Sequence, residues 1–383
     1  MNLFLLLTFG VFLFFSLGIY LNTSFVAGKN ANLANQRLTL YPVLILMFSL
    51  FVIISSFQYI DLSSSARWLN SNSNDLSRYK MGFDSFGSKS LKEAFFISGY
   101  EPLYTLTVFL IRKITKHFSF ALLIIYAFNF ISMYSFLKAV NTKNLFFYFV
   151  FFVLFFTEIL TSYCLLRMGI AVSFVLISYI FLMRKNYKKA ILFSFIACGF
   201  HVSASFCFFV IVLYKFSENH TLKRLLFFAF VCFVLLLIFS KFLNYIITLI
   251  FPAKAVYLES NEGVAKNTYL TNFLFLMFLL FNQKNFYENK ESRLMFCILL
   301  STFYILSLQM VVTVFYRMIF FSYAGTSFII YLLWNNYGSN KKMFSTFFVR
   351  SFISFYLLYF LYKFSTAQWF SYGLDRFKLF FVN

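Results

Sequence analysis

The stretch LLRMGIAVSFVLISYIFLM (residues 165–183) carries one charged residue, Arg167, near the start of a mostly apolar run. About 20 apolar residues in a helix are enough to cross the hydrocarbon core of a bilayer. Because that core holds no water, the backbone groups of a spanning segment must bond within the helix. The stretch therefore predicts a transmembrane helix that begins beside an arginine.

The rest of the chain is similar in character. Hydrophobic residues make up 61% of it and charged residues 12%, whereas soluble domains carry roughly 25% charged residues. We therefore predict an all-α fold, a polytopic transmembrane helix bundle in which residues 1–383 form a single membrane domain. The other candidate spans lie near 2–21, 39–60, 118–137, 145–162, 225–250, 268–282, 294–314, 318–334 and 343–363. Residues 190–215 are either one long helix or two short ones hinged near His201.

Charge predicts the orientation. The chain has a formal net charge of +21, which in a soluble protein would indicate nucleic acid but here sets topology, so no nucleic-acid partner is predicted. Short basic loops face the cytoplasm. All the basic clusters do so only if residues 190–215 cross twice, which gives about 12 spans with both termini outside. The clusters are Lys29/Arg37, Lys138/Lys143, Arg184/Lys185/Lys188/Lys189, Lys223/Arg224, Lys284/Lys290/Arg293 and Lys341/Lys342.

Three segments are then external. These are a large loop at 61–117, a second loop at 252–267 and the tail 364–383. Within the large loop, SGYEPLYTLTVFLIRKIT (residues 98–115) is too short for a span and predicts a surface helix near 100–116, with Pro102 and Glu101 in its first turn. This helix should lie along the outer membrane surface or dip into the bundle. Its apolar face is predicted to comprise Leu103, Leu106, Phe109 and Leu110.

Charged and titratable residues at span ends are candidates for function. Arginine within a span costs several kcal/mol, so Arg167 and Arg317, both at predicted outer turns, are candidate phosphate ligands. A long side chain that reaches the headgroups is the alternative. His201 lies in an apolar stretch and is a candidate base or phosphate donor, or else a neutral core histidine.

The large loop supplies further candidates. Asp75, Arg78 and Tyr79 lie together in NDLSRYKMGF, and Glu101 precedes Pro102. The alternatives are a solvated loop and a residue that only starts a helix. No metal-ligand motif or glycine-rich phosphate loop is present, so neither a metal nor a cofactor is predicted. The five cysteines form no CxxC pair and are expected to be free thiols.

The order of four motifs resembles the EpsG-like branch of the Wzy polysaccharide polymerases. The motifs are NDLSRY (74–79), GYEPLY (99–104), LRMGIAV (166–172) and, after a basic run, GFHVSAS (199–205). The resemblance covers about residues 60–215. Beyond it the likeness is one of hydropathy, with a Tyr-Arg pair at Arg317. The chain departs from the family at Met168, where a glutamine is usual, so a sugar contact by that glutamine would be absent or moved here.

The resemblance implies a bacterial inner-membrane O-antigen or exopolysaccharide polymerase with a fold similar to the GT-C glycosyltransferases. Such enzymes transfer a growing glycan from undecaprenyl diphosphate to a lipid-linked repeat unit at the outer face of the membrane, without a metal. The implied partners are the lipid-linked donor and acceptor and the membrane lipids, with a chain-length regulator protein as a further candidate.

Roles can be proposed on this basis. Arg167 and Arg317 are assigned to the donor diphosphate, with Arg112 or Arg78 assisting. Tyr79 and Tyr104 are further candidates for binding the diphosphate or the glycan. Glu101 is the first choice of base, before His201 and Asp75. An O-antigen ligase, a flippase or other lipid-linked transporter, and a membrane protein without activity are the alternatives. Crowding of the charged candidates at the predicted outer face, with no internal repeat, favours the polymerase over the transporter.

Overall fold

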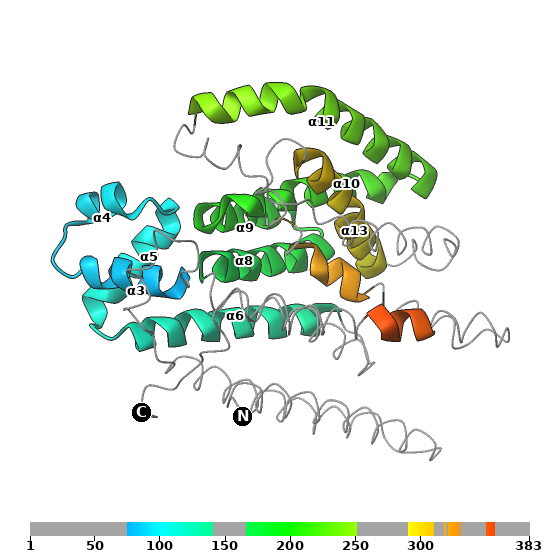
Figure 1. The fold of residues 1–383 in the computed structure, drawn as a ribbon. Coiled ribbons are helices and arrows are strands. Elements are labelled where there is room, and N and C mark those ends of the chain that lie inside the picture. Colours follow the sequence, from blue (N-terminus) through cyan, green and yellow to red (C-terminus); the bar gives the residue numbers. More distant parts are fainter. Residues whose placement is uncertain are drawn as a thin grey trace, which may run out of the picture. The chain divides into compact units, whose positions relative to one another are not determined.

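The computed structural model describes residues 75–140, 166–250, 290–309, 318, 321–328, 330 and 350–356 (Figure 1). Within these ranges the chain is helical and has no strand, which confirms the all-α fold class for this part. The elements are α3 (Asp75–Ser85), α4 (Leu91–Ser98), α5 (Pro102–Ile114), α6 (Phe118–Val140), α8 (Leu166–Met183), α9 (Tyr187–Phe200), the 3₁₀ helix η2 (Val202–Ser205), α10 (Phe206–Asn219), α11 (Leu222–Ile250) and α13 (Lys290–Gln309). The chain divides into two compact units, Met1–Ser173 with Tyr356–Asn383, and Phe174–Phe355.

Three segments of the described part are long and apolar enough to cross a membrane. They are Phe118–Val140, Leu166–Met183 and Val202–Asn219. The first two match the predicted spans 118–137 and 165–183. The predicted spans 225–250 and 294–314 correspond to helices α11 and α13. Those near 2–21, 39–60, 145–162 and 268–282 lie outside the described residues, as do the loop 252–267 and the tail 364–383. The spans 318–334 and 343–363 are described only in part.

In the first unit, three short helices precede the span α6. Helix α5 packs on α3, α4 and α6, and the ring of Phe83 on α3 lies 5.3 Å from that of Phe118, the first residue of α6. Helix α4 starts with a capping box in which Ser90 and Glu93 bond each other's backbone. These hydrogen bonds from Ser90 lower the pKa of the Glu93 carboxyl. The short helices are therefore anchored where the span begins.

The segment near 100–116 contains helix α5, but its buried face is rotated from the predicted apolar face. Leu110 is exposed, and Leu103 and Leu106 are half-buried, so of the predicted set only Phe109 lies in the core. The buried residues are Tyr104, Thr105, Val108, Phe109 and Ile111. Hydropathy missed this face because two of its members, Tyr104 and Thr105, carry hydroxyl groups. They are buried because α5 packs against three helices and does not lie alone on a surface.

The second unit contains a helical hairpin that turns at His201. Helix α9 ends at Phe200 and α10 begins at Phe206, with η2 between them. The rings of Phe195 and Phe208, on either side of the turn, lie 4.8 Å apart. Ser178 on α8 contacts both arms, through the hydroxyl of Ser194 at 3.0 Å and the thiol of Cys207 at 3.5 Å. The predicted hinge near His201 is confirmed, and residues 190–215 form two helices.

Two of the predicted cytoplasmic clusters lie near each other at the open end of this hairpin, which is one end of the second unit. Glu218, near the end of α10, lies 3.5 Å from Lys185 in the α8–α9 turn and 3.5 Å from Lys215. The next helix begins at the same end, because the ring of Phe216 stacks on Phe228 of α11 at 4.2 Å. The turns 184–189 and 219–224 therefore lie together at one end of the second unit.

Candidate functional site

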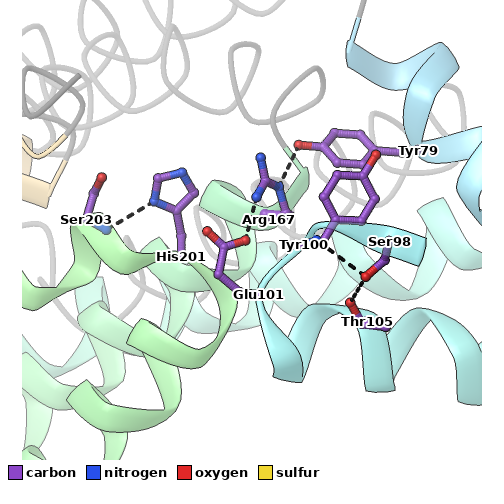
Figure 2. A network of polar contacts seen from close by, with 8 residues as sticks. All are labelled: Tyr79, Ser98, Tyr100, Glu101, Thr105, Arg167, His201 and Ser203. Carbon is purple, nitrogen blue, oxygen red and sulfur yellow. Dashed lines mark hydrogen bonds and ion pairs between the residues drawn. The ribbon is translucent and has the colours of Figure 1, made fainter. Parts of the chain in front are cut away.

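The turn between α4 and α5 carries Tyr100 and Glu101, whose side chains lie beside Arg167 (Figure 2). Gly99 ends α4 with φ 59°, a left-handed conformation that costs other residues more. The hydroxyl of Ser98 lies 2.9 Å from that of Thr105 and accepts a hydrogen bond from the Tyr100 backbone N–H at 3.3 Å. The turn is thus bonded back onto α5, and both side chains leave it from fixed positions.

Glu101 starts α5 but does not cap it. Its backbone occupies the N-cap position ahead of Pro102, and its carboxylate makes no hydrogen bond to the N–H groups of the first turn. Instead, Oε2 of Glu101 accepts a hydrogen bond from Nη1 of Arg167 at 2.5 Å. The side chains of Glu101 and Arg167 are 10% and 18% exposed. Since a buried carboxylate is costly unless it is paired, the arginine favours this position of the Glu101 side chain.

Arg167 is held from three directions. It is the second residue of α8, and its Nε donates a hydrogen bond to the hydroxyl of Tyr79 at 3.2 Å. Its guanidinium carbon lies 4.9 Å from the ring centroid of Tyr100 and 5.9 Å from that of Tyr79. A guanidinium has five N–H donors, and Nη2 makes no hydrogen bond with any residue that the structure describes. The arrangement fixes the cation and leaves donors for an anion.

Three tyrosine rings pack against one another beside this arginine. The ring centroids of Tyr79, Tyr100 and Tyr104 lie 5.4 to 5.5 Å from one another, with Tyr100 and Tyr104 edge to face. Tyr104 is 1% exposed, and its hydroxyl has no hydrogen-bond partner within the described ranges. Burial raises the pKa of Tyr104 well above its ordinary value, so the phenol stays protonated.

Other predicted site residues occupy different places. Arg112 lies at the far end of α5, where its guanidinium carbon is 5.3 Å from the Phe83 ring centroid and its tip passes so close to Gly87 that a Cβ there would be 2.7 Å from Nη2. Asp75 is the first residue of α3, and Arg78 on the same helix is half-buried. Arg317 lies outside the described residues.

His201 belongs to the second unit and has a defined tautomer. Its Nδ1 accepts a hydrogen bond from the backbone N–H of Ser203 at 3.2 Å, which caps η2. A nitrogen that accepts cannot carry the proton, so in the neutral ring the proton is on Nε2. His201 is 8% exposed. This state makes Nε2 a hydrogen-bond donor.

Tyr100 and the Ser98–Thr105 bond were not predicted. The sequence signal that could have indicated Tyr100 is its position in GYEPLY, directly before the candidate carboxylate Glu101. Among the described residues no group of three His, Cys, Asp or Glu side chains could hold a metal ion, and Cys198, Cys207, Cys232 and Cys297 are free thiols.

Comparison with known proteins gives one match. The family model of the EpsG family matches residues 62–374, more than half of the chain. No curated protein and no solved structure matches the chain. The match reaches well beyond the stretch near 60–215 that carries the motif resemblance, and it includes the region of Arg317. With the apolar helices it points to a membrane polysaccharide polymerase of glycosyltransferase type, and the chain belongs to the EpsG family.

Proposed function

We propose that this protein polymerises oligosaccharide repeat units linked to undecaprenyl diphosphate, at the outer face of the cytoplasmic membrane. The observation that supports the proposal is Arg167, an arginine at the start of a candidate span. Glu101 and Tyr79 hold it, and its Nη2 bonds to no residue in the described part of the chain. An oriented guanidinium is well suited to a diphosphate, because its planar N–H groups match phosphate oxygens. The positive end of the α8 dipole lies at the same place.

The donor diphosphate binds to Arg167 in this proposal, and Arg317 and Arg78 are further candidates for its oxygens. The phosphate oxygens first take the Nη2 donors and then compete with the Glu101 carboxylate for Nη1. The guanidinium neutralises charge that grows on the leaving diphosphate, which is where electrostatic stabilisation lowers a barrier most. The proposed step needs no metal ion for this purpose.

Glu101 is the proposed base. The acceptor hydroxyl oxygen attacks the anomeric carbon of the donor, a C–O bond forms, and the bond from that carbon to the diphosphate oxygen breaks. The hydroxyl proton passes to the Glu101 carboxylate, and undecaprenyl diphosphate leaves with the bonding electron pair. A single displacement inverts the anomeric centre. Competition from the diphosphate for Arg167 makes Glu101 a stronger base, since a carboxylate that loses a cation holds a proton more readily.

The remaining residues have supporting roles. Tyr79 and Tyr100 orient the guanidinium, and Tyr104 supports their rings, because at 1% exposure it presents almost no surface of its own. His201, with its proton on Nε2, is proposed as a hydrogen-bond donor to a phosphate oxygen. Asp75 remains the alternative base if Glu101 serves only to position Arg167.

The test is polymer synthesis by the purified protein in liposomes that contain lipid-linked repeat units and no other protein. Polymer from the parent, and none from well-folded Arg167→Ala and Glu101→Gln, is the expected result. Failure of the parent to make polymer while it moves the lipid-linked unit across the bilayer would identify a transporter. In cells, loss of a polymerase leaves one repeat unit on the lipid A core, whereas loss of a ligase leaves none.

A further inference from the structure

Helix α4 buries a small residue and exposes large apolar ones, which is the reverse of what is expected for a helix in water. It is eight residues long and too short for a span. Its small residue, Ala94, is buried at 0% exposure, while Phe96 is 81% exposed and Leu91 and Phe95 are each 38% exposed. Single exposed apolar residues are common, but three in two turns form a surface that calls for a partner. We refer to Leu91, Phe95 and Phe96 as the α4 patch.

Basic groups border this patch. Lys92 lies within α4 and is exposed, and Lys89 precedes the helix by two residues. Lys113, at the end of α5, donates hydrogen bonds from Nζ to the carbonyls of Lys89 at 3.3 Å and Gly87 at 3.5 Å, so its charge lies beside the turn that leads into α4. The acidic residue of the helix, Glu93, is bonded to Ser90. With three lysines against this one glutamate, the border of the patch carries a net positive charge.

The patch also lies close to where a span begins. Helix α4 packs on α5, and α5 packs on α6, whose first residue contacts Phe83 of α3. Helix α6 is one of the candidate spans. Apolar side chains bordered by lysines, next to the end of a span, match the composition of the membrane interface, with acyl chains beneath anionic headgroups.

We propose that the α4 patch inserts into the interface of the membrane that α6 crosses, with Phe95 and Phe96 among the upper acyl carbons and Lys89, Lys92 and Lys113 at anionic headgroups. Insertion of the α4 patch ties the large loop to the bilayer through α4, which packs on α5. The inference uses no residue of the proposed reaction and does not rest on that reaction. Its partner is lipid, and not the glycan or a second protein.

The experiment places a tryptophan at the tip of the patch. Phe96→Trp adds little crowding because the position is exposed, and the signal of the three native tryptophans, measured in the parent, is subtracted. The full protein is reconstituted in vesicles of phosphatidylglycerol and phosphatidylethanolamine with brominated acyl chains. Phe120→Trp, at an exposed position in the first turn of α6, is the positive control for lipid contact.

We expect brominated chains to lower the emission of the tryptophan at position 96 by about twofold, as for a residue at the acyl boundary. Lys92→Glu should weaken this quenching in anionic vesicles and leave it unchanged in phosphatidylcholine, whereas Lys188→Glu in the second unit should change neither. Emission that is long in wavelength and quenched by iodide would place the residue in water and overturn the proposal. Emission that is short in wavelength and quenched by neither agent would overturn it in favour of a protein partner.

Discussion

Arg167 and Glu101 are 66 residues apart in the chain and form an ion pair in which neither side chain is more than 18% exposed. The pair joins the large loop to the first turn of a candidate span. Removing one member of a buried pair leaves the other charge without compensation, which is more destabilising than removing both. The pair can therefore be examined separately for stability and for function.

Arg167→Lys is the first prediction. A lysine keeps the charge but cannot donate to Tyr79 and Glu101 from one rigid plane while it offers further donors to an anion. We expect polymer synthesis to fall by at least about tenfold, the loss from roughly 1.4 kcal/mol of barrier, with the protein still folded. The measurement is the initial rate of polymer formation in liposomes.

A neutral pair provides the control for stability. Arg167→Ala should lower the free energy of unfolding by up to about 3 kcal/mol because Glu101 loses its ion pair with Arg167. The double variant Arg167→Gln/Glu101→Gln should recover most of this stability and remain inactive. Recovery of polymer synthesis in the double variant would show that neither charge takes part in the reaction.

Two tyrosines allow a matched comparison of hydroxyl groups. Tyr79→Phe removes the acceptor for Nε of Arg167, so we expect lower activity and a loss of about 1 kcal/mol of stability. Tyr104→Phe removes a buried hydroxyl that has no partner among the described residues, so we expect unchanged or slightly higher stability. Thermal unfolding and polymer synthesis measured on both variants would decide, and equal losses would contradict the assignment.

Gly99→Ala tests the turn. With φ at 59°, an alanine there is strained by about 1 kcal/mol, although no atom blocks the added Cβ within 4 Å. The expected result is a modest loss of stability with a larger loss of polymer synthesis, since Tyr100 and Glu101 follow directly. Gly99→Asn, which tolerates this conformation better, should recover part of both. An alanine variant with full activity would mean that the turn does not position the site.

Arg112→Met tests a residue that the sequence placed in the site. Arg112 lies at the opposite end of α5 from Glu101, about 16 Å along a helix at 1.5 Å per residue. Methionine retains apolar contact with Phe83. We expect polymer synthesis to remain within about twofold of the parent, a change of under 0.5 kcal/mol in the barrier. A loss as large as that of Arg167→Lys would bring Arg112 back into the diphosphate site.

Labelling of single cysteines tests the orientation. In a background without native cysteines, a cysteine at Lys188, in the basic end of the second unit, should react with a membrane-impermeant reagent only from the cytoplasm. A cysteine at Ser88, exposed before α4, should react from outside. Reaction of both from the same side would contradict the predicted topology.

Periodicity and charge predicted much of the described fold. The bounds of α6 and α8 and the break at His201 follow from apolar length and from the polar residues that interrupt it. Glu101, Arg167 and Tyr79 were singled out one by one, because charge near a span is costly wherever it occurs. Their contact was not predicted, since it depends on how α3, the α4–α5 turn and α8 pack. The buried face of α5 was missed because burial there depends on three neighbouring helices.

The hairpin at His201 has a consequence for how such chains can diverge. Because α9 leaves the basic end of its unit and α10 returns to it, the pair changes the direction of no later helix. Loss or gain of both arms together would leave α11 starting from the same end of its unit, whereas loss of a single arm would make it start from the other end. The hairpin as a whole, and not one of its two helices, is therefore the unit that can be exchanged in this part of the chain.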